Sequence, residues 1–132
     1  MVAAMPEATR LFREWNRDPL GDPRFRLIVD DARSYIAHTR QRYDIIISEP
    51  SNPWMAGTGA LFSSEFYSQA ATALGPDGVY LQWLQAYELT DQTFAAVVRT
   101  FRRVFPHVYA FQGNADDVLL LGSRLHRGSD RR

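Results

Sequence analysis

Four stretches of the chain are predicted to be helical, and hydrophobic residues recur with helical spacing in the first and the last of them. In the first, residues 6–17, apolar side chains stand at positions i, i+3, i+4 and i+7, and a proline suits the first turn. The other three stretches are residues 32–40, 63–74 and 91–105. A hydroxyl side chain stands at the start of each of the last two and suits an N-cap: Ser63 opens the third stretch and Thr90 precedes the fourth. The pattern therefore predicts four helices.

Short apolar runs between these helices predict strands. The predicted strands are residues 25–29, 43–48, 79–84, 107–112 and 117–122. Residues 45–47 are three isoleucines, a run too short for a helix and β-branched throughout, so that strand is expected to be fully buried. Residues 75–78 (GPDG) end the third helix, and residues 113–116 join the last two strands as a hairpin. Helices and strands that alternate in this way predict an α/β fold.

Composition narrows the possible classes of protein. With 132 residues and 45% apolar content the chain can form one domain, which we expect to span residues 1–122, followed by a disordered polar tail over residues 123–132. The net charge of zero argues against a nucleic-acid partner, and the lack of cysteine excludes disulfides. The three histidines have no metal-ligand spacing, so no metal is expected. No apolar run approaches the ~20 residues that span a bilayer, and we expect a soluble chain.

Candidate chemistry follows the isoleucine strand. The loop Glu49-Pro50-Ser51-Asn52-Pro53 is stiffened by two prolines. Ligands of open α/β sheets bind just beyond the carboxyl ends of the strands, so Glu49 and Asn52 are candidates for contact with a substrate. Structural roles remain as alternatives: Glu49 could cap the next loop or pair with an arginine, and Asn52 suits a turn before proline.

The same stretch carries a resemblance to a known family. The strand YDIII, the acid-x-x-(Asp/Asn)-Pro loop and the run LFSSEFY (residues 61–67) resemble the spermidine/spermine synthase family, and most closely its spermidine synthase-like domains fused to membrane segments. The resemblance runs from about Glu7 to Gly122. It implies a class I methyltransferase-like (Rossmann-like) sheet with a C-terminal antiparallel hairpin. The family's Gly-rich loop and ribose-binding acid have no counterpart here, so we expect a partial domain whose first two strands are absent.

The resemblance also implies roles for individual residues. Glu49 matches the family's catalytic acid, and Asn52 matches a second acid that helps to hold the polyamine. The family typically reads Asp-Ser-x-Asp-Pro where this chain reads Glu-Pro-Ser-Asn-Pro. Asp31 with Ala32 matches an Asp-(Gly/Ala) pair whose carboxylate contacts the adenine of the donor. Asp30 and Asp31 are equally candidates to cap the helix that follows.

Aromatic, amide and acidic side chains supply further candidates for substrate contact. They are Asn52, Trp54, Gln82, Gln85, Tyr87 and Glu88. Trp54 and Tyr87, together with Trp83 and Tyr67, could form a cage that holds an ammonium group through cation–π contacts, with plain packing as the alternative. The two glutamines flank Trp83, and the strand period of two leaves open which of them faces the cleft.

The function that the resemblance implies is aminopropyl transfer from a decarboxylated S-adenosylmethionine-type donor to a small-molecule amine. The alternatives are a methyltransferase that uses S-adenosylmethionine, and a non-catalytic domain of a larger membrane protein. As a partial domain the chain alone is expected to be inactive. A cytoplasmic location is expected, with tethering by a membrane segment of a longer parent protein left open. The bare edge of the isoleucine strand would favour a homo-oligomer.

Overall fold

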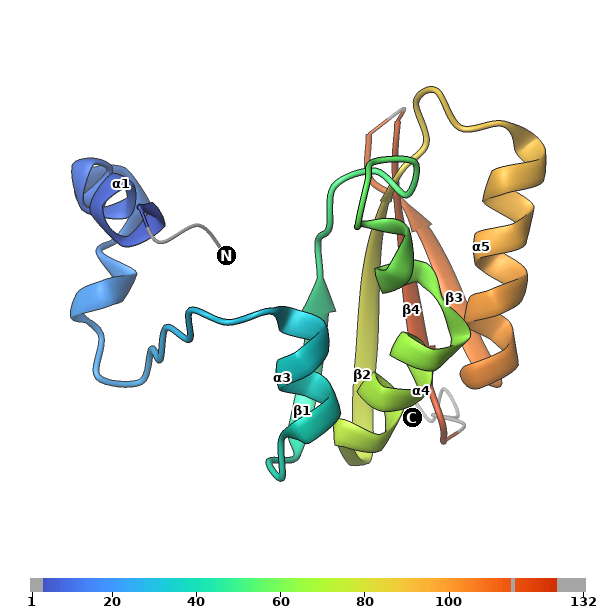
Figure 1. Cartoon of the computed structure of the whole chain (residues 1–132), viewed down its shortest axis with the longest axis horizontal. Helices are drawn as coiled ribbons and strands as arrows, with labels where there is room; N and C mark the ends of the chain where they lie inside the picture. Colours follow the sequence, from blue (N-terminus) through green and yellow to red (C-terminus); the bar gives the residue numbers. More distant parts are fainter. Residues whose placement is uncertain (1–3, 115, 126–132) are drawn as a thin grey trace, which may run out of the picture. The chain divides into compact units, whose positions relative to one another are not determined.

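The structure is a computed structural model that describes residues 4–114 and 116–125 (Figure 1). The chain divides into two compact units, Met1–Tyr35 and Ile36–Arg132, which are described one at a time. Most of the predicted tail, residues 126–132, lies outside the described residues. No helix in the described part of the chain is long and apolar enough to cross a membrane.

The first unit is built from short helices. They are α1 (Met5–Leu11), α2 (Arg13–Asn16) and the 3-10 helix η1 (Pro19–Gly21). The single helix predicted for residues 6–17 is thus wrong, because the chain breaks at Phe12, whose φ of −106° and ψ of 14° are not helical. Within its own unit nothing buries the apolar stripe, since Leu11 and Trp15 are strongly exposed. Helical segments this short are marginal without tertiary packing, which accounts for the interruption.

The strand predicted for residues 25–29 is also wrong. The segment belongs to no sheet, because no strand among the described residues pairs with it. A strand needs a neighbour to accept and donate its backbone hydrogen bonds. The helix predicted next is confirmed as α3 (Ala32–His38).

The second unit contains a four-stranded mixed sheet in the order β1-β2-β4-β3. Its strands are β1 (Tyr43–Ser48), β2 (Leu74–Gln85), β3 (His107–Gln112) and β4 (Asp117–Ser123). β1 and β2 run parallel, whereas β4 is antiparallel to both of its neighbours. The 3-10 helix η2 (Gly59–Phe62) and α4 (Ser64–Ala73) connect β1 to β2, and α5 (Asp91–Val104) connects β2 to β3. The α/β class and the C-terminal hairpin are confirmed.

Both predicted helix caps are present. The Ser63 hydroxyl accepts a hydrogen bond from the Phe66 amide at 3.2 Å, at the start of α4. The Thr90 hydroxyl accepts one from the Thr93 amide, also at 3.2 Å, at the start of α5. Each cap satisfies a backbone donor that the first helical turn leaves without an intrahelical partner.

β2 begins earlier than the sequence suggests. Residues 75–78 end α4 as predicted, yet they lie inside β2, where the register with β1 shifts. Tyr43 pairs with Leu74 and Ile45 pairs with Val79, so two steps along β1 correspond to five along β2. A Cβ on Gly78 would lie 2.9 Å from the Tyr43 carbonyl oxygen, which makes glycine the residue that this close approach requires.

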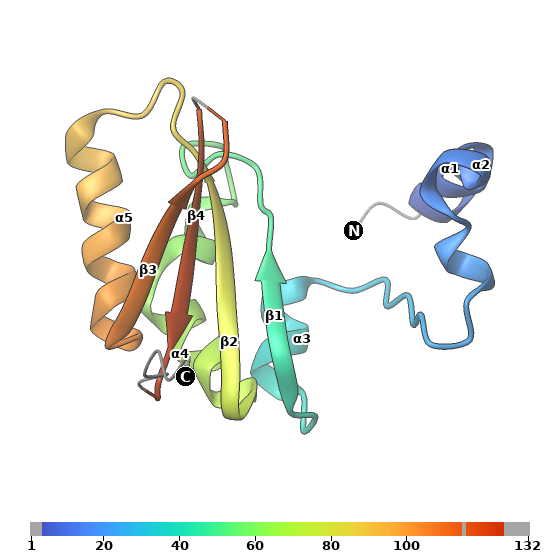
Figure 2. The same cartoon turned by 180° about the vertical axis from the view of Figure 1, so that it is seen from behind.

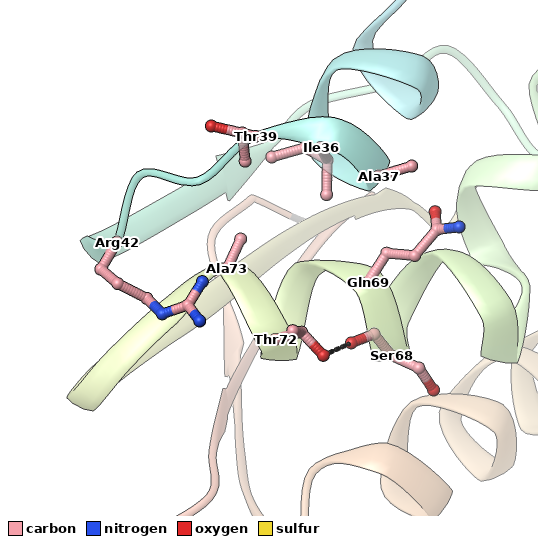
Figure 3. Close-up of a pocket in the computed structure, with 8 residues that line it drawn as sticks. All are labelled: Ile36, Ala37, Thr39, Arg42, Ser68, Gln69, Thr72 and Ala73. Atoms are coloured by element: carbon pink, nitrogen blue, oxygen red, sulfur yellow. Dashed lines mark hydrogen bonds between the residues drawn. The ribbon is translucent and has the colours of Figure 1, made fainter.

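An aromatic core fills the space between the helices and one face of the sheet. Tyr67 of α4 packs against Tyr80 of β2 and Phe101 of α5, with ring centroids 5.8 and 5.1 Å apart. The Tyr80 ring also stacks on Phe105 at 5.3 Å. Figures 1 and 2 show α4 and α5 on the same face of the sheet, which places this core on the helical side.

The opposite face of the sheet is apolar as well, and among the described residues of this unit no helix covers it (Figure 2). The strand register aligns one row of its side chains across the sheet: Ile47, Leu81, Leu121 and Tyr109. Ile45 and Ile47 are 60% and 61% exposed, whereas Ile46 packs on the core. The prediction of a fully buried Tyr43–Ser48 strand is therefore wrong, because β1 is the outermost strand of this sheet and the described helices of its own unit cover only one face.

Candidate active site

The loops that follow β1 and β2 lie at one edge of the sheet. Ser48, the last residue of β1, pairs with Gln82 near the end of the parallel strand β2. Because parallel strands direct their carboxyl ends to the same edge, the loop from Glu49 and the loop from Ala86 emerge side by side (Figure 1). The predicted substrate site is thus assembled from two loops that are far apart in the sequence.

Asn52 and Tyr87 join these loops. The Asn52 Nδ2 donates a hydrogen bond to the Tyr87 hydroxyl at 2.9 Å. Asn52 is only 8% exposed, and its Oδ1 has no hydrogen-bond partner among the described residues. The ring of Trp54 meets that of Tyr87 edge-on, with centroids 6.1 Å apart. These three side chains, all predicted as substrate contacts, lie together.

Glu49 is the first residue beyond β1, where the strand and Pro50 fix its backbone. Its side chain is exposed and forms no hydrogen bond or ion pair with any described residue. The carboxylate is therefore free to contact a cation in solvent. The predicted alternatives, a loop cap or an arginine pair, find no contact in the described part of the chain.

The two glutamines lie on opposite faces of β2. Gln82 is fully buried, and its amide takes part in three hydrogen bonds. The Tyr80 hydroxyl donates to its Oε1 at 3.1 Å. Its Nε2 donates to the carbonyls of Ser48 at 3.3 Å and Trp83 at 2.8 Å. It thereby ties the end of β1 to β2 on the core side. Gln85 is half-buried at the end of β2, next to the loop that carries Tyr87.

The prediction that four aromatic rings form a cage is wrong for two of the rings. Tyr67 lies in the aromatic core, fully buried. Trp83 lies on the uncovered face, where its Nε1 donates to the Asp117 Oδ1 at 3.1 Å. Only Trp54 and Tyr87 remain as a ring pair at the loops. Glu88, next to Tyr87, is exposed and takes a left-handed backbone conformation with φ of 57°.

Asp31 and Ala32 belong to the first unit, at the start of α3. The Asp31 Oδ2 accepts a hydrogen bond from the Ser34 amide at 2.9 Å, so Asp31 caps the helix. That backbone hydrogen bond lowers the pKa of the Asp31 carboxyl below its ordinary value, and the Ser34 side chain adds to the effect. The Asp31 backbone amide donates in turn to the Asp30 Oδ1 at 2.7 Å. The adenine contact suggested for Asp31 stays a prediction.

The described residues do not form a cluster of metal ligands. Across residues 4–114 and 116–125, no three side chains of His, Cys, Asp or Glu gather in a group that could hold a metal ion.

Two solved structures share this fold. A spermidine synthase crystallised with the transition state analogue AdoDATO matches 93% of this chain and 44% of its own, with a TM-score of 0.81 and 22% sequence identity. Human methyltransferase-like protein 13, in complex with SAH, matches 94% of this chain and 59% of its own, with a TM-score of 0.72 and 21% identity. At these identities the likeness establishes the class of fold: α/β, of the kind shared by spermidine synthases and methyltransferases.

Sequence comparison identifies the family. The model of the spermine/spermidine synthase domain family matches residues 8–114. The polyamine aminopropyltransferase of Aeropyrum pernix is 34% identical over 103 residues, which cover 75% of this chain and 32% of that protein. The chain thus belongs to the spermine/spermidine synthase domain family, and it spans about a third of the length of the curated relatives it matches.

Proposed function

We propose that this domain transfers an aminopropyl group from a decarboxylated S-adenosylmethionine-type donor to a small-molecule amine. The observation that carries the proposal is the exposed carboxylate of Glu49, which follows the carboxyl end of β1 and has no partner among the described residues. The family resemblance would make this carboxylate the catalytic acid. The names of its relatives support the reaction, since they are polyamine aminopropyltransferases.

Glu49 has two tasks in this proposal. An alkylamine has a pKa near ~10, like lysine, so it arrives as an ammonium ion without a free lone pair. The carboxylate first attracts this cation and then takes one of its protons. The freed nitrogen attacks the propyl carbon next to the sulfonium, so that a C–N bond forms as the C–S bond breaks. The electron pair of that bond stays on sulfur and leaves a neutral thioether.

The test of this role is Glu49→Gln, in the longest form of the protein that its gene encodes. The substitution keeps the shape of the side chain but removes both its charge and its basicity. Turnover should fall by about 10²–10⁴, the usual worth of a general base, while binding of methylthioadenosine stays within about twofold. Higher pH should restore part of the rate, because free amine then becomes available without a base.

Asp44→Asn is a matched control, since Asp44 is an exposed acid near the opposite end of the same strand. It should leave turnover unchanged. Unaltered turnover in Glu49→Gln, or an equal loss in the control variant, would show that Glu49 is not the base.

A methyltransferase is the second candidate, favoured by the likeness to human methyltransferase-like protein 13. Both reactions break a bond to a sulfonium, but they differ in the carbon that is transferred. Incubation with S-adenosylmethionine and with its decarboxylated form, each with the same amines, separates them by product mass. If only methylated products form, the proposed reaction is methyl transfer and not aminopropyl transfer.

A further inference from the structure

The Asn52–Tyr87 pair bears on which amine the site accepts. We propose that Asn52 selects an acceptor with one cationic nitrogen and a neutral, hydrogen-bond-donating far end, such as an amino alcohol, over an α,ω-diamine. This inference rests on the proposed aminopropyl transfer and deepens it. A carboxylate at this position would favour a second positive charge, and this chain has an amide there.

The orientation of the amide makes Oδ1 the group available to a ligand. The Nδ2 donates to the Tyr87 hydroxyl at 2.9 Å, which leaves Oδ1 without a partner among the described residues. The reverse orientation would leave an NH₂ group with two unpaired donors. A buried donor without a partner is rarer in proteins than an under-satisfied carbonyl oxygen, so the observed orientation is the favourable one.

Because the Asn52 Oδ1 is buried, it should favour a neutral hydroxyl over an ammonium group. Asn52 is 8% exposed, so a group bound at its Oδ1 loses water. A hydroxyl replaces that water with one hydrogen bond, whereas an ammonium would lose its hydration without meeting an opposite charge. The Trp54 and Tyr87 rings are 45% and 40% exposed, so the side chains that lie with Asn52 reach the protein surface.

The carboxylates nearby have different tasks. Glu49 receives the reacting nitrogen, as proposed above. Glu88 follows Tyr87 in the second loop, but it is exposed, and water weakens its attraction to a distant cation. Asn52 is therefore the polar side chain of these two loops that meets the far end of the acceptor out of water.

The experiment compares two probes of equal length, 4-aminobutan-1-ol and 1,4-diaminobutane, which differ only at the far end. We expect the wild-type protein to show the higher kcat/KM with the amino alcohol. Asn52→Asp, the isosteric charged variant, should shift the ratio of the two values by about 10- to 100-fold toward the diamine. Tyr87→Phe should reduce the preference by releasing the amide, and Glu88→Gln should affect both probes equally.

Calorimetry with the Glu49→Gln protein supplies a readout that needs no turnover. It should bind the amino alcohol more tightly than the diamine, and the added Asn52→Asp change should reverse that order. If the protein binds the two probes with different affinities but transfers no aminopropyl group to either, the proposed reaction is refuted. The proposed selectivity of Asn52 would then still stand. Transfer with a wild-type preference for the diamine, or binding of neither probe, would overturn the inference. The wild-type comparison decides the matter even if a variant fails to fold.

Discussion

Two tyrosines in the aromatic core differ in what their hydroxyl groups contact. The Tyr80 hydroxyl donates to Gln82, whereas the Tyr67 hydroxyl is buried without a hydrogen-bond partner among the described residues. A buried hydroxyl without a partner loses its hydration and gains nothing in return. Two residues of the same type, with rings in contact, are therefore expected to respond in opposite ways to the same substitution.

Tyr67→Phe should raise the free energy of unfolding by about 1 kcal/mol, because it removes an unpaired buried polar group. Tyr80→Phe should lower it by about 1–2 kcal/mol, because it leaves the Gln82 Oε1 unpaired in the core. Urea denaturation of the two variants beside the wild type measures both effects. A loss of stability in Tyr67→Phe equal to that in Tyr80→Phe would mean that the Tyr67 hydroxyl has a partner.

The same two residues make stability depend on alkaline pH. Burial raises the pKa of both hydroxyls, that of Tyr80 to about 12. In the unfolded chain they ionise near ~10, so above that pH the unfolded state loses protons that the native state keeps. The contribution of these two tyrosines to stability should thus be constant below pH ~10 and fall as the pH rises toward 12. Unfolding curves between pH 8 and 12 should show a shallower fall in the double phenylalanine variant.

At the scale of elements, the packing of α5 on β4 depends on a glycine, Gly122, which has no side chain. A Cβ at Gly122 would lie 2.6 Å from Phe105 and 2.8 Å from Phe101. Both rings are fully buried, so neither can move aside cheaply. The glycine is there because of this close approach between helix and strand.

Gly122→Ala should therefore cost about 1–3 kcal/mol of stability through overpacking. Gly113→Ala is the matched control at the other end of the hairpin, where the nearest atom to an added Cβ is 3.5 Å away. Thermal or urea unfolding should separate the two variants clearly. Equal costs would point to a backbone effect of glycine replacement and not to contact with the rings.

At the scale of the whole molecule, the uncovered face of the sheet governs behaviour in solution. Contiguous exposed apolar surface promotes association, and an outermost strand offers unpaired backbone groups as well. We expect the chain to self-associate as its concentration rises. The double variant Ile45→Thr/Ile47→Thr should reduce association, because it keeps β-branching but removes apolar surface. Sedimentation velocity across a concentration series measures this, and a monodisperse wild-type monomer at every concentration would contradict it.

Local sequence patterns were sufficient for much of this fold. The caps at Ser63 and Thr90, the strand Tyr43–Ser48 and the C-terminal hairpin all rest on interactions within a few residues or on the period of the chain. The position of Glu49 beyond the first parallel strand follows from the same patterns, and the family resemblance is the source of the role proposed for it. Residues 25–29 show the limit, because an extended apolar segment becomes a strand only when another strand pairs with it.

Which faces are buried, and which loops meet, was decided by the tertiary structure alone. Gln82 shares its face of β2 with the buried Tyr80 and Leu84, a relation that becomes informative only once the helices are known to cover that face. Asn52 and Tyr87 stand 35 positions apart, and their hydrogen bond exists because β1 and β2 are parallel neighbours. The sequence by itself determined most elements of the second unit and the acid at the end of β1, since these depend on local spacing. The partner of Asn52 depends on a contact between distant segments, which only the folded sheet creates.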